Sequence, residues 1–309
     1  MADMRTAVVI PSLGGPSLPN CLEAVVSQTA PPARLVVVLS AGGELAEHSG
    51  EVEVLRVPDR LGFAAAVNRG IGAVEEDVEA VAILNDDALP NPRWLEVLSK
   101  ALQEGDSAAV QGTVSDAEGI KVDGRGIEFD RWGLPNQVER GSSASDGNRV
   151  AEARFGLSAT AVLFRTQVLQ DIALSNGKVF DEVFDCYHED TDLLLRMNRL
   201  NLGLSWIPGA PCRHLGSTTG TKLSWRHPWW LLSNRWRALA GNLTAFGLFR
   251  GVPRLMRGEV RAVRTLARGN ALVWLVEFAV ILAAPFIVVR ALFRKTKGPR
   301  LTRLPGPHS

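Results

Sequence analysis

The chain has 309 residues and a formal net charge of only +1, but its charges are unevenly distributed. Residues 1–212 contain 31 acidic and 17 basic side chains, whereas residues 213–309 contain 17 basic side chains and only two acids, Glu259 and Glu277. The 46% hydrophobic content excludes a disordered chain, and three widely spaced cysteines exclude a disulfide framework and a cysteine zinc site and favour a reducing cytosol.

Short apolar runs alternate with amphipathic stretches in the first third of the chain, and Pro11 ends the first run. Continuous apolar strands separated by helices are typical of βαβ units, so we predict an α/β fold with a mostly parallel sheet covered by helices on both faces. Ligands of such sheets bind beyond the carboxyl ends of the strands. The predicted strands are Thr6–Ile10, Leu35–Leu39, Val52–Val57 and Ala80–Leu84, and the predicted helices are Leu18–Gln28 and Phe63–Val74.

The middle of the chain has a weaker pattern. Residues 105–152 are rich in Gly, Asp and Ser, which predicts irregular structure with some short strands. Ala159–Arg165 predicts a further strand. Glu189–Leu202 predicts a helix, because acids occupy its first turn, arginines come late and Gly203 follows its end.

The sequence changes in character after about His214. Between 252 and 268, five arginines fall within roughly 80° of a helical wheel and seven apolar residues fall on the opposite side, so we predict a basic amphipathic helix there. Residues 271–289 then contain a single charge, Glu277, and the tail 290–309 contains six basic residues and no acid. The arginines are Arg254, Arg257, Arg261, Arg264 and Arg268; the apolar residues are Val252, Leu255, Met256, Val260, Val263, Leu266 and Ala267.

The first candidate functional motif is Asn85-Asp86-Asp87, at the end of a predicted strand. Two adjacent carboxylates repel each other unless a cation or hydrogen-bond donors neutralise them. Mg²⁺ and Mn²⁺ prefer oxygen ligands of this kind and commonly bind through one or two carboxylates plus substrate phosphates. The alternative is a solvated turn before Pro90 and Pro92.

The second candidate is Tyr187-His188-Glu189-Asp190-Thr191-Asp192, at the start of a predicted helix. Acids in a first turn are commonly caps, but three acids beside a histidine exceed what capping needs. A carboxylate here can accept a proton from a hydroxyl nucleophile. His214 alone indicates only a structural or solvated histidine, and it becomes a candidate metal ligand only together with Asp87.

The third candidate is the loop–helix junction from Arg60 to Gly70, which contains glycine and several small residues. Such residues let a ligand approach the backbone closely. Tight packing of a helix on the sheet explains the same composition, so both interpretations stay open.

In order and spacing, these motifs resemble those of the family 2 glycosyltransferases with the GT-A fold, especially bacterial rhamnosyltransferase-like members. The resemblance covers about residues 5–240. The matching segments are Ala7–Ser12, Cys21–Gln28, Gly62–Ala64 with Asn68–Gly70, Leu84–Asp87 with Pro90 and Trp94-Leu95, Phe180–Phe184, and Tyr187–Leu193, followed by Gly203, Pro208 and His214.

The resemblance implies a role for each candidate residue. Asp87 would bind a divalent cation, Mg²⁺ or Mn²⁺, and His214 would add a metal ligand. Asp190 would be the general base, with Glu189 holding the acceptor or orienting that part of the site. The nucleotide-sugar site would comprise Pro11, Ser12, Ser40, Arg60, Gly62, Asn68, Asn85 and Asp86.

The resemblance also implies a reaction. A hexose would move from a UDP- or dTDP-linked donor to a hydroxyl of a lipid-linked or cell-envelope glycan, with inversion at the anomeric carbon. The chain departs from the family pattern at two positions. The family commonly has an acid after the second strand, where this chain has Ser40, and an Asn where this chain has Arg60. These departures leave an alternative open. A catalytically degraded GT-A domain serving as a membrane-bound scaffold is the second hypothesis, and a nucleotidyltransferase is the third.

We divide the chain into a GT-A catalytic domain, 1–215, and a C-terminal helical region, 216–309, that associates with membrane. The basic region would hold the acidic domain at the cytoplasmic face of an anionic cell membrane. The apolar segment 271–289 is short for a membrane span and Glu277 is costly in lipid, so a single span, an in-plane helix, an oligomerisation surface and a helix packed on the domain all stay open. Such an apolar run does not suit nucleic acid, which we do not expect as a partner.

Overall fold

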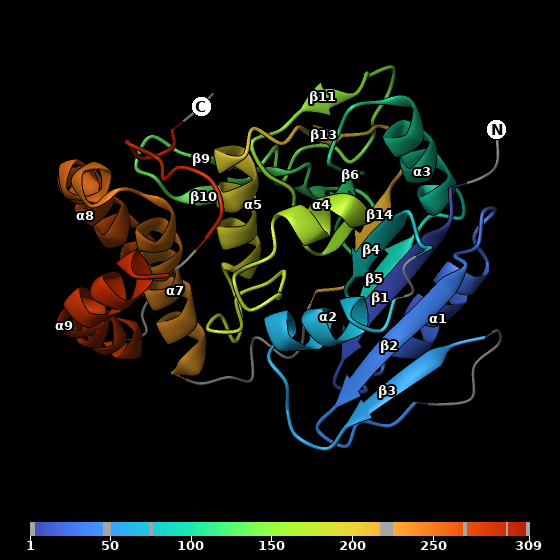
Figure 1. Ribbon diagram of the computed structural model, residues 1–309, viewed down its shortest axis with the longest axis horizontal. Helices are drawn as coiled ribbons and strands as arrows, with labels where there is room; N and C mark the ends of the chain where they lie inside the picture. Colours follow the sequence, from blue (N-terminus) through green and yellow to red (C-terminus); the bar gives the residue numbers. More distant parts are fainter. Residues whose placement is uncertain are drawn as a thin grey trace.

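The computed structural model describes residues 4–45, 51–74, 77–216, 225–267, 271–294 and 296–306. Within these residues the central sheet has eight strands, in the order β11-β13-β6-β12-β4-β1-β2-β3 (Figure 1). The neighbours from β3 to β4 are parallel, and so are β13 and β6, whereas β12 is antiparallel to both β4 and β6 and the edge strand β11 is antiparallel to β13. The predicted mostly parallel sheet is therefore confirmed, with two antiparallel strands, β12 and β11. The strands are β1 (Thr6–Ser12), β2 (Arg34–Ser40), β3 (Glu53–Val57), β4 (Ala80–Leu84), β6 (Ala109–Gln111), β11 (Glu152–Ala153), β12 (Ala161–Arg165) and β13 (Leu204–Trp206).

Helices cover both faces of the sheet because alternate strand residues point to opposite sides. Val8 and Ile10 of β1 pack in one apolar core with α1 and α3, and Ala7 and Val9 pack in a second core with α2, α4 and α5. The helices are α1 (Leu18–Val26), α2 (Phe63–Ile71), α3 (Trp94–Glu104), α4 (Thr166–Asp171) and α5 (Glu189–Arg199).

Several predicted boundaries differ from the structure; for example, α1 ends at Val26 and α2 at Ile71, before the predicted Gln28 and Val74. Two further differences have a clear physical reason. β1 continues through Pro11, which pairs in register with Val38 of β2 and lies beyond the last residue that pairs with β4, Val9. Proline is tolerated there because it is close to the end of the strand. At the end of α5, Asn201 adopts the left-handed conformation with φ of 54°, and the N–H of residue 202 reaches the carbonyl of Met197. Asn201 therefore takes the helix-ending role expected of Gly203.

The segment after α3 forms a second wall beside the sheet, as the prediction of short strands in irregular structure anticipated. In the described part of the chain it contributes to a four-stranded sheet, β5-β14-β7-β8, and to the hairpin β9–β10. β14 pairs antiparallel with β5 and sets His214 opposite Ala88, which brings the histidine next to Asp87. The strands are β5 (Ala88–Pro90), β7 (Val114–Ser115), β8 (Val122–Gly124), β9 (Ile127–Phe129), β10 (Pro135–Gln137) and β14 (Cys212–His214).

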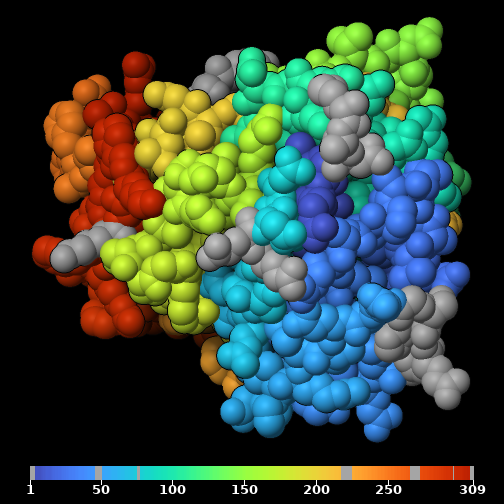
Figure 2. All heavy atoms as spheres, turned by 45° about the vertical axis from the view of Figure 1, so that its right-hand side comes forward, coloured from blue at the N-terminus to red at the C-terminus, as the bar shows by residue number. Residues whose placement is uncertain are grey.

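Three C-terminal helices, α7 (Arg226–Asn242), α8 (Ala245–Ala267) and α9 (Ala271–Leu292), build a third apolar core with residues of α5 and β9. Figures 1 and 2 place α8 and α9 at the end of the molecule away from β2 and β3. The helix α8 contains residues 252–267 of the predicted amphipathic segment, whose last residue, Arg268, lies outside the described residues, and only part of the apolar side is buried. Leu255 and Val263 face the core, whereas Met256 is exposed.

Candidate active site

A cavity of about 840 Å³ lies beyond the carboxyl ends of β1, β2 and β4, where a sheet of this type binds its ligands. The second wall closes one side of the cavity through Asp123 and the hairpin residues Pro135–Gln137. Every predicted site residue except Gly62 and Asn68 lines it. The lining therefore includes Pro11, Ser12, Ser40, Arg60, Asn85, Asp86, Asp87, Glu189, Asp190 and His214.

The two adjacent aspartates after β4 have different surroundings. Asp86 accepts a hydrogen bond from the Ser12 hydroxyl, with 2.5 Å between Oδ2 and Oγ, and the N–H of Gly14 donates to the same hydroxyl oxygen at 2.9 Å. Burial raises the pKa of Asp86, and the charge of Asp87 adds to that rise, while the Ser12 hydrogen bond opposes it. Asp86 therefore ties the end of β1 to the end of β4 at the floor of the cavity.

His214 lies between two carboxylates. Its Nδ1 is 3.0 Å from Oδ2 of Asp123 and its Nε2 is 3.3 Å from Oδ1 of Asp87. Burial lowers the pKa of His214, but Asp123 and Asp87 outweigh burial and raise it to about 9. A carboxylate that fixes Nδ1 in this way is the usual support for a histidine whose Nε2 binds a metal.

Several polar atoms in this wall are buried without a hydrogen bond of good geometry, although Nε2 of His214 lies close to Asp87. Among the described residues, Oδ1 of Asn85, Oδ2 of Asp87 and Nε2 of His214 have no hydrogen-bond partner. Buried polar groups are nearly always paired, and such exceptions commonly mark a site for an ion or ligand. The donor set of carboxylate oxygen, amide oxygen and imidazole nitrogen suits a divalent cation.

A strained turn presents the second pair of acids. Tyr187 and His188 both adopt positive φ angles, 66° and 67°, immediately before α5. A contact with α7 holds this turn, because Nε2 of His188 is 3.0 Å from the carbonyl oxygen of Leu231. The other ring nitrogen, Nδ1, is 3.2 Å from the Thr191 hydroxyl of α5. Burial lowers the pKa of His188 to about 3, so this histidine is neutral and structural. Strain of this kind persists where surrounding contacts fix the site.

Glu189 and Asp190 open α5 and face the cavity. Oδ1 of Asp190 accepts the N–H of Thr191 at 2.6 Å, and Oε2 of Glu189 is buried without a hydrogen-bond partner among the described residues. Burial raises the pKa of both carboxyls, and the Asp190 charge raises the pKa of Glu189 further. The pair therefore retains a proton more readily than isolated carboxyls do, as suits a proton-transfer site.

Arg60 stands at the rim of the cavity and is held by an acid that the sequence did not single out. Its Nη1 lies 3.0 and 3.1 Å from the two carboxylate oxygens of Asp185, and its guanidinium lies 5.7 Å from the ring centroid of Trp230 in α7. The C-terminal helices thus support this part of the rim.

Gly62 and Asn68 have structural positions instead of lining the cavity. A Cβ on Gly62 would lie 2.3 Å from Oδ1 of Asp185, so only glycine lets α2 begin this close to that segment. Asn68 donates to the carbonyl of Phe180 at 2.8 Å and accepts the N–H groups of Val179 and Phe180. Both residues fix the 179–185 segment that leads into α5.

Asp123 and Asp185 are site residues that sequence reasoning missed. Asp123 lies in the region 105–152, whose sequence pattern is weak. Asp185 lies between the motifs Phe180–Phe184 and Tyr187–Leu193 and belongs to neither. The acid-rich stretch around Glu189 could have indicated Asp185, which stands four residues before that glutamate. No local signal indicated that Asp123 would meet His214, which is distant in sequence.

Comparison with known proteins identifies the family. Residues 7–173, more than half of the chain, match the sequence model of glycosyl transferase family 2. The chain therefore belongs to glycosyl transferase family 2, and its fold is of the GT-A type. A search of curated proteins found no match.

Solved structures with this fold include the crystal structure of GalNAc-T7 with UDP, GalNAc and Mn²⁺, which is 12% identical with a TM-score of 0.57 over 78% of this chain and 48% of that chain. The S. aureus TarS structure is 14% identical with a TM-score of 0.48, over 77% of this chain and 42% of that one. At this identity the likeness to GalNAc-T7 concerns the fold alone, and the chain spans about half the length of the GalNAc-T7 chain.

Proposed function

We propose that the protein is an inverting, divalent-metal-dependent glycosyltransferase that transfers a hexose, with rhamnose the first candidate, from a UDP- or dTDP-linked donor. The acceptor would be a hydroxyl of a lipid-linked or cell-envelope glycan at the cytoplasmic face of the cell membrane. The observation that carries the proposal is one cavity that joins the unsatisfied Asp87–His214 pair to the buried Glu189–Asp190 pair.

Asp87 and His214 would hold Mg²⁺ or Mn²⁺. Among the described residues, no group of three or more His, Cys, Asp or Glu is placed to bind a metal, so the remaining ligands would be diphosphate oxygens and water. When bound, the cation would offset the charge that develops on the leaving diphosphate. GalNAc-T7 was crystallised with UDP and Mn²⁺, which supports this assignment through the shared fold.

Asp190 would act on the acceptor. Its carboxylate would take the proton from the acceptor hydroxyl as the oxygen attacks the anomeric carbon from the face opposite the diphosphate, which inverts that centre. Glu189 would hold the acceptor hydroxyl or keep Asp190 oriented. Ser12, Asn85 and Asp86 would contact the donor, because they form the floor at the ends of β1 and β4.

Donor binding provides the direct test. We expect a nucleoside diphosphate with Mn²⁺, at 100 times its Kd, to stabilise the protein by about 2.7 kcal/mol, which a thermal-shift titration of UDP, dTDP, GDP and ADP will detect. Asp87→Ala should remove the Mn²⁺-dependent part of the shift, and the exposed Asp106→Ala should not change it. A wild-type protein that is not shifted by any of these diphosphates would favour the degraded-scaffold hypothesis that Ser40 raises.

The pH dependence tests the assignment of the base. Because burial raises the pKa values of both Glu189 and Asp190, we expect the acidic limb of kcat/KM to lie above the usual carboxyl range. Activity is then lost as the pH falls through this raised value, when the base becomes protonated. Since burial is what raises the pKa of Asp190, the Glu189→Gln variant should keep its acidic limb above the usual carboxyl range. A limb that falls into the usual range in this variant would assign the titration to Glu189 instead.

A further inference from the structure

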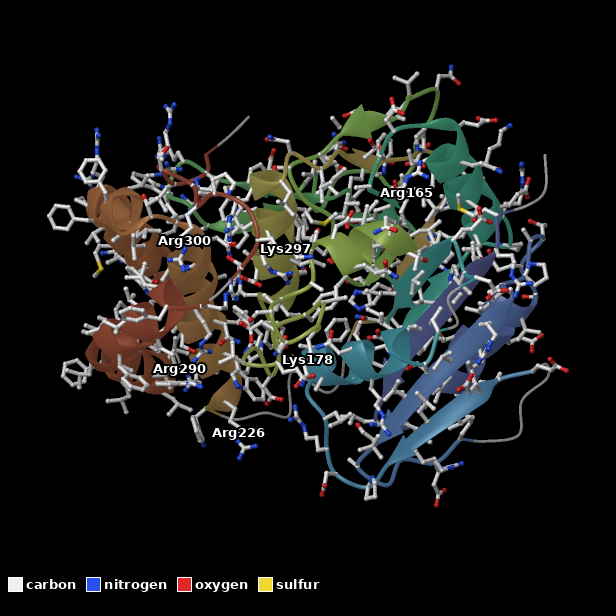
Figure 3. All side chains as sticks on the ribbon, viewed as in Figure 1. Arg165, Lys178, Arg226, Arg290, Lys297 and Arg300 are labelled. Atoms are coloured by element: carbon white, nitrogen blue, oxygen red, sulfur yellow. The ribbon has the colours of Figure 1, made fainter. Side chains whose placement is uncertain are left out.

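The helices α8 and α9 expose large apolar side chains, here called the apolar face and defined by Phe249 and Met256 of α8 and by Trp274, Phe278, Leu282 and Phe286 of α9. Phe249, Phe278 and Phe286 are 76%, 62% and 71% exposed. The two residues of α8 are seven positions apart and the four of α9 are each four positions apart, which places them along one side of each helix. Figure 3 shows aromatic side chains projecting outward from this end of the molecule.

Cations flank the apolar face without acids. Arg250, Arg257 and Arg264 recur every seven residues along α8, so they form an exposed stripe beside the apolar one. Figure 3 labels two further exposed arginines, Arg226 at the start of α7 and Arg290 in the last turn of α9.

The two carboxylates of residues 213–309 are directed away from this surface. Glu259 is 2% exposed and pairs with Arg235 of α7, and Glu277 is 6% exposed. The sequence contains no other acid after residue 212. Among the described residues after 224, the exposed charged side chains are therefore all positive, which complements an anionic surface.

α9 is apolar enough to span a bilayer, since Leu272–Leu292 has a mean hydropathy of 2.6, but both of its ends contact the rest of the protein. Near its N-terminal end, Val273 and Val276 are buried in the third apolar core. The middle of the preceding helix α8 is also held, because Arg254 donates to the carbonyls of Asp130 at 3.0 Å and Arg131 at 2.5 Å in the β9–β10 hairpin. On the C-terminal side, Arg294 donates to Asp181 at 2.8 Å. A helix of this length covers about 33 Å along its axis, so a span would carry one end away from these partners.

We propose that α8 and α9 lie in the plane of an anionic membrane, with the apolar face in the headgroup–acyl boundary and the arginines on lipid phosphates. An in-plane helix buries one apolar side while its other side stays on protein or water, as α9 does with its inner side on α7. A second copy of this chain is less suited as the occupant, because two stripes of like-charged arginines would face each other across such an interface.

This placement also bears on how the acceptor arrives, a point that rests on the proposed function. The β9–β10 hairpin joins α8 to the active site, because its turn binds Arg254 and its strand β10 (Pro135–Gln137) lines the cavity. A lipid-linked acceptor at the membrane surface would therefore reach the cavity past this hairpin without leaving the bilayer.

Co-sedimentation of the full-length protein with vesicles of phosphatidylglycerol and phosphatidylcholine tests the proposal. We expect binding that weakens with salt, and alkaline carbonate should release the bound protein. Trp274→Ser with Phe278→Ser should weaken binding by about 100-fold or more, since each side chain contributes on the order of 1.5–3 kcal/mol when buried. Arg250→Gln with Arg257→Gln and Arg264→Gln should weaken it by roughly 100-fold. The matched control is Ile120→Ser with Val150→Ser, two exposed apolar residues on the catalytic domain.

Three results would overturn the proposal. If the protein does not bind these vesicles at low salt but still hydrolyses the donor, the apolar face does not bind membrane, although the proposed enzyme is active. Protein that resists carbonate extraction spans the bilayer. A concentration-dependent dimer that the Trp274→Ser, Phe278→Ser variant abolishes, together with unchanged vesicle binding, assigns the apolar face to a second copy. If the protein binds vesicles but does not turn over any donor, the result supports membrane binding by the apolar face and contradicts only the proposed function.

Discussion

We expect Asp190→Asn to lower the rate of sugar transfer by about 10²–10⁴-fold, which is the range for loss of a general base, the role proposed for Asp190. The substitution keeps the shape of the side chain and an oxygen that can accept the N–H of Thr191, so α5 should still begin at Glu189. The lost property is the ability to hold the acceptor proton. Single-turnover transfer, measured alongside donor binding by calorimetry, separates this chemical loss from a loss of affinity.

Asp106→Asn provides the control for that measurement, because Asp106 is exposed and remote from the cavity. We expect the control to transfer sugar at the wild-type rate. If Asp190→Asn also keeps the wild-type rate, the base must be another group, and Glu189 is the nearest candidate. If it lowers donor affinity and leaves the chemical step intact, Asp190 belongs to the donor site.

The parallel half of the fold could be predicted because it is encoded locally. β1, β2 and β4 contain continuous apolar runs, and a strand buried on both faces produces such a run wherever it occurs. The edge strand β3 is only partly buried and includes Glu53 and Arg56. The strand β4 agrees with the prediction at both ends. The second sheet was not predictable in detail, because β7 is two residues long and acquires its structure only by pairing with β8 and β14.

The candidate site, like the fold, could be predicted only in part from the sequence. The sequence motifs led to Asp87, His214 and Asp190, and the fold brings all three to one cavity. Asn68 belonged to an equally good motif, yet its amide is fully used in holding Val179 and Phe180. A motif position identifies a residue that the family fold requires, and it does not show whether that requirement is contact with substrate or support of the backbone.

The helix α8 shows why an amphipathic pattern is ambiguous. A helical wheel separates arginines from apolar residues, but it does not divide the apolar residues between core and surface. Leu255 and Val263 face the core, while Phe249 and Met256 face outward. The division depends on where the β9–β10 hairpin meets α8, which is a long-range contact.

Arg294→Met should destabilise the protein by about 3 kcal/mol, because it leaves buried carboxylates without one of their cations. Arg294 pairs with Asp181 and with Asp192, and the carboxylate of Asp192 is fully buried. Arg196 remains at 3.0 Å from Asp192, which keeps the loss near the lower end for such pairs. Urea unfolding followed by tryptophan fluorescence measures the change.

The double variant Arg294→Met, Asp192→Asn distinguishes the ion pair from simple loss of packing. Removing both charges should cost less than the sum of the two single substitutions, whereas independent effects would add. Arg303→Met is the control, because Arg303 is exposed in the same tail. A loss equal to that of the control would show that the Arg294 contact adds nothing to stability.

The loss of stability at low pH provides a second test of the ion pair between Arg294 and Asp192. Burial raises the pKa of Asp192, but Arg294 and Arg196 outweigh burial and hold it below its usual range. The resulting stability is present at neutral pH and is lost as the pH falls through that lowered value. Arg294→Met raises the pKa of Asp192 and should therefore reduce this loss of stability on acidification. Asp192 lies two residues after Asp190 on α5, so the contact of Arg294 with Asp192 also supports the position of the proposed base. Loosening this contact should therefore lower transfer as well as stability.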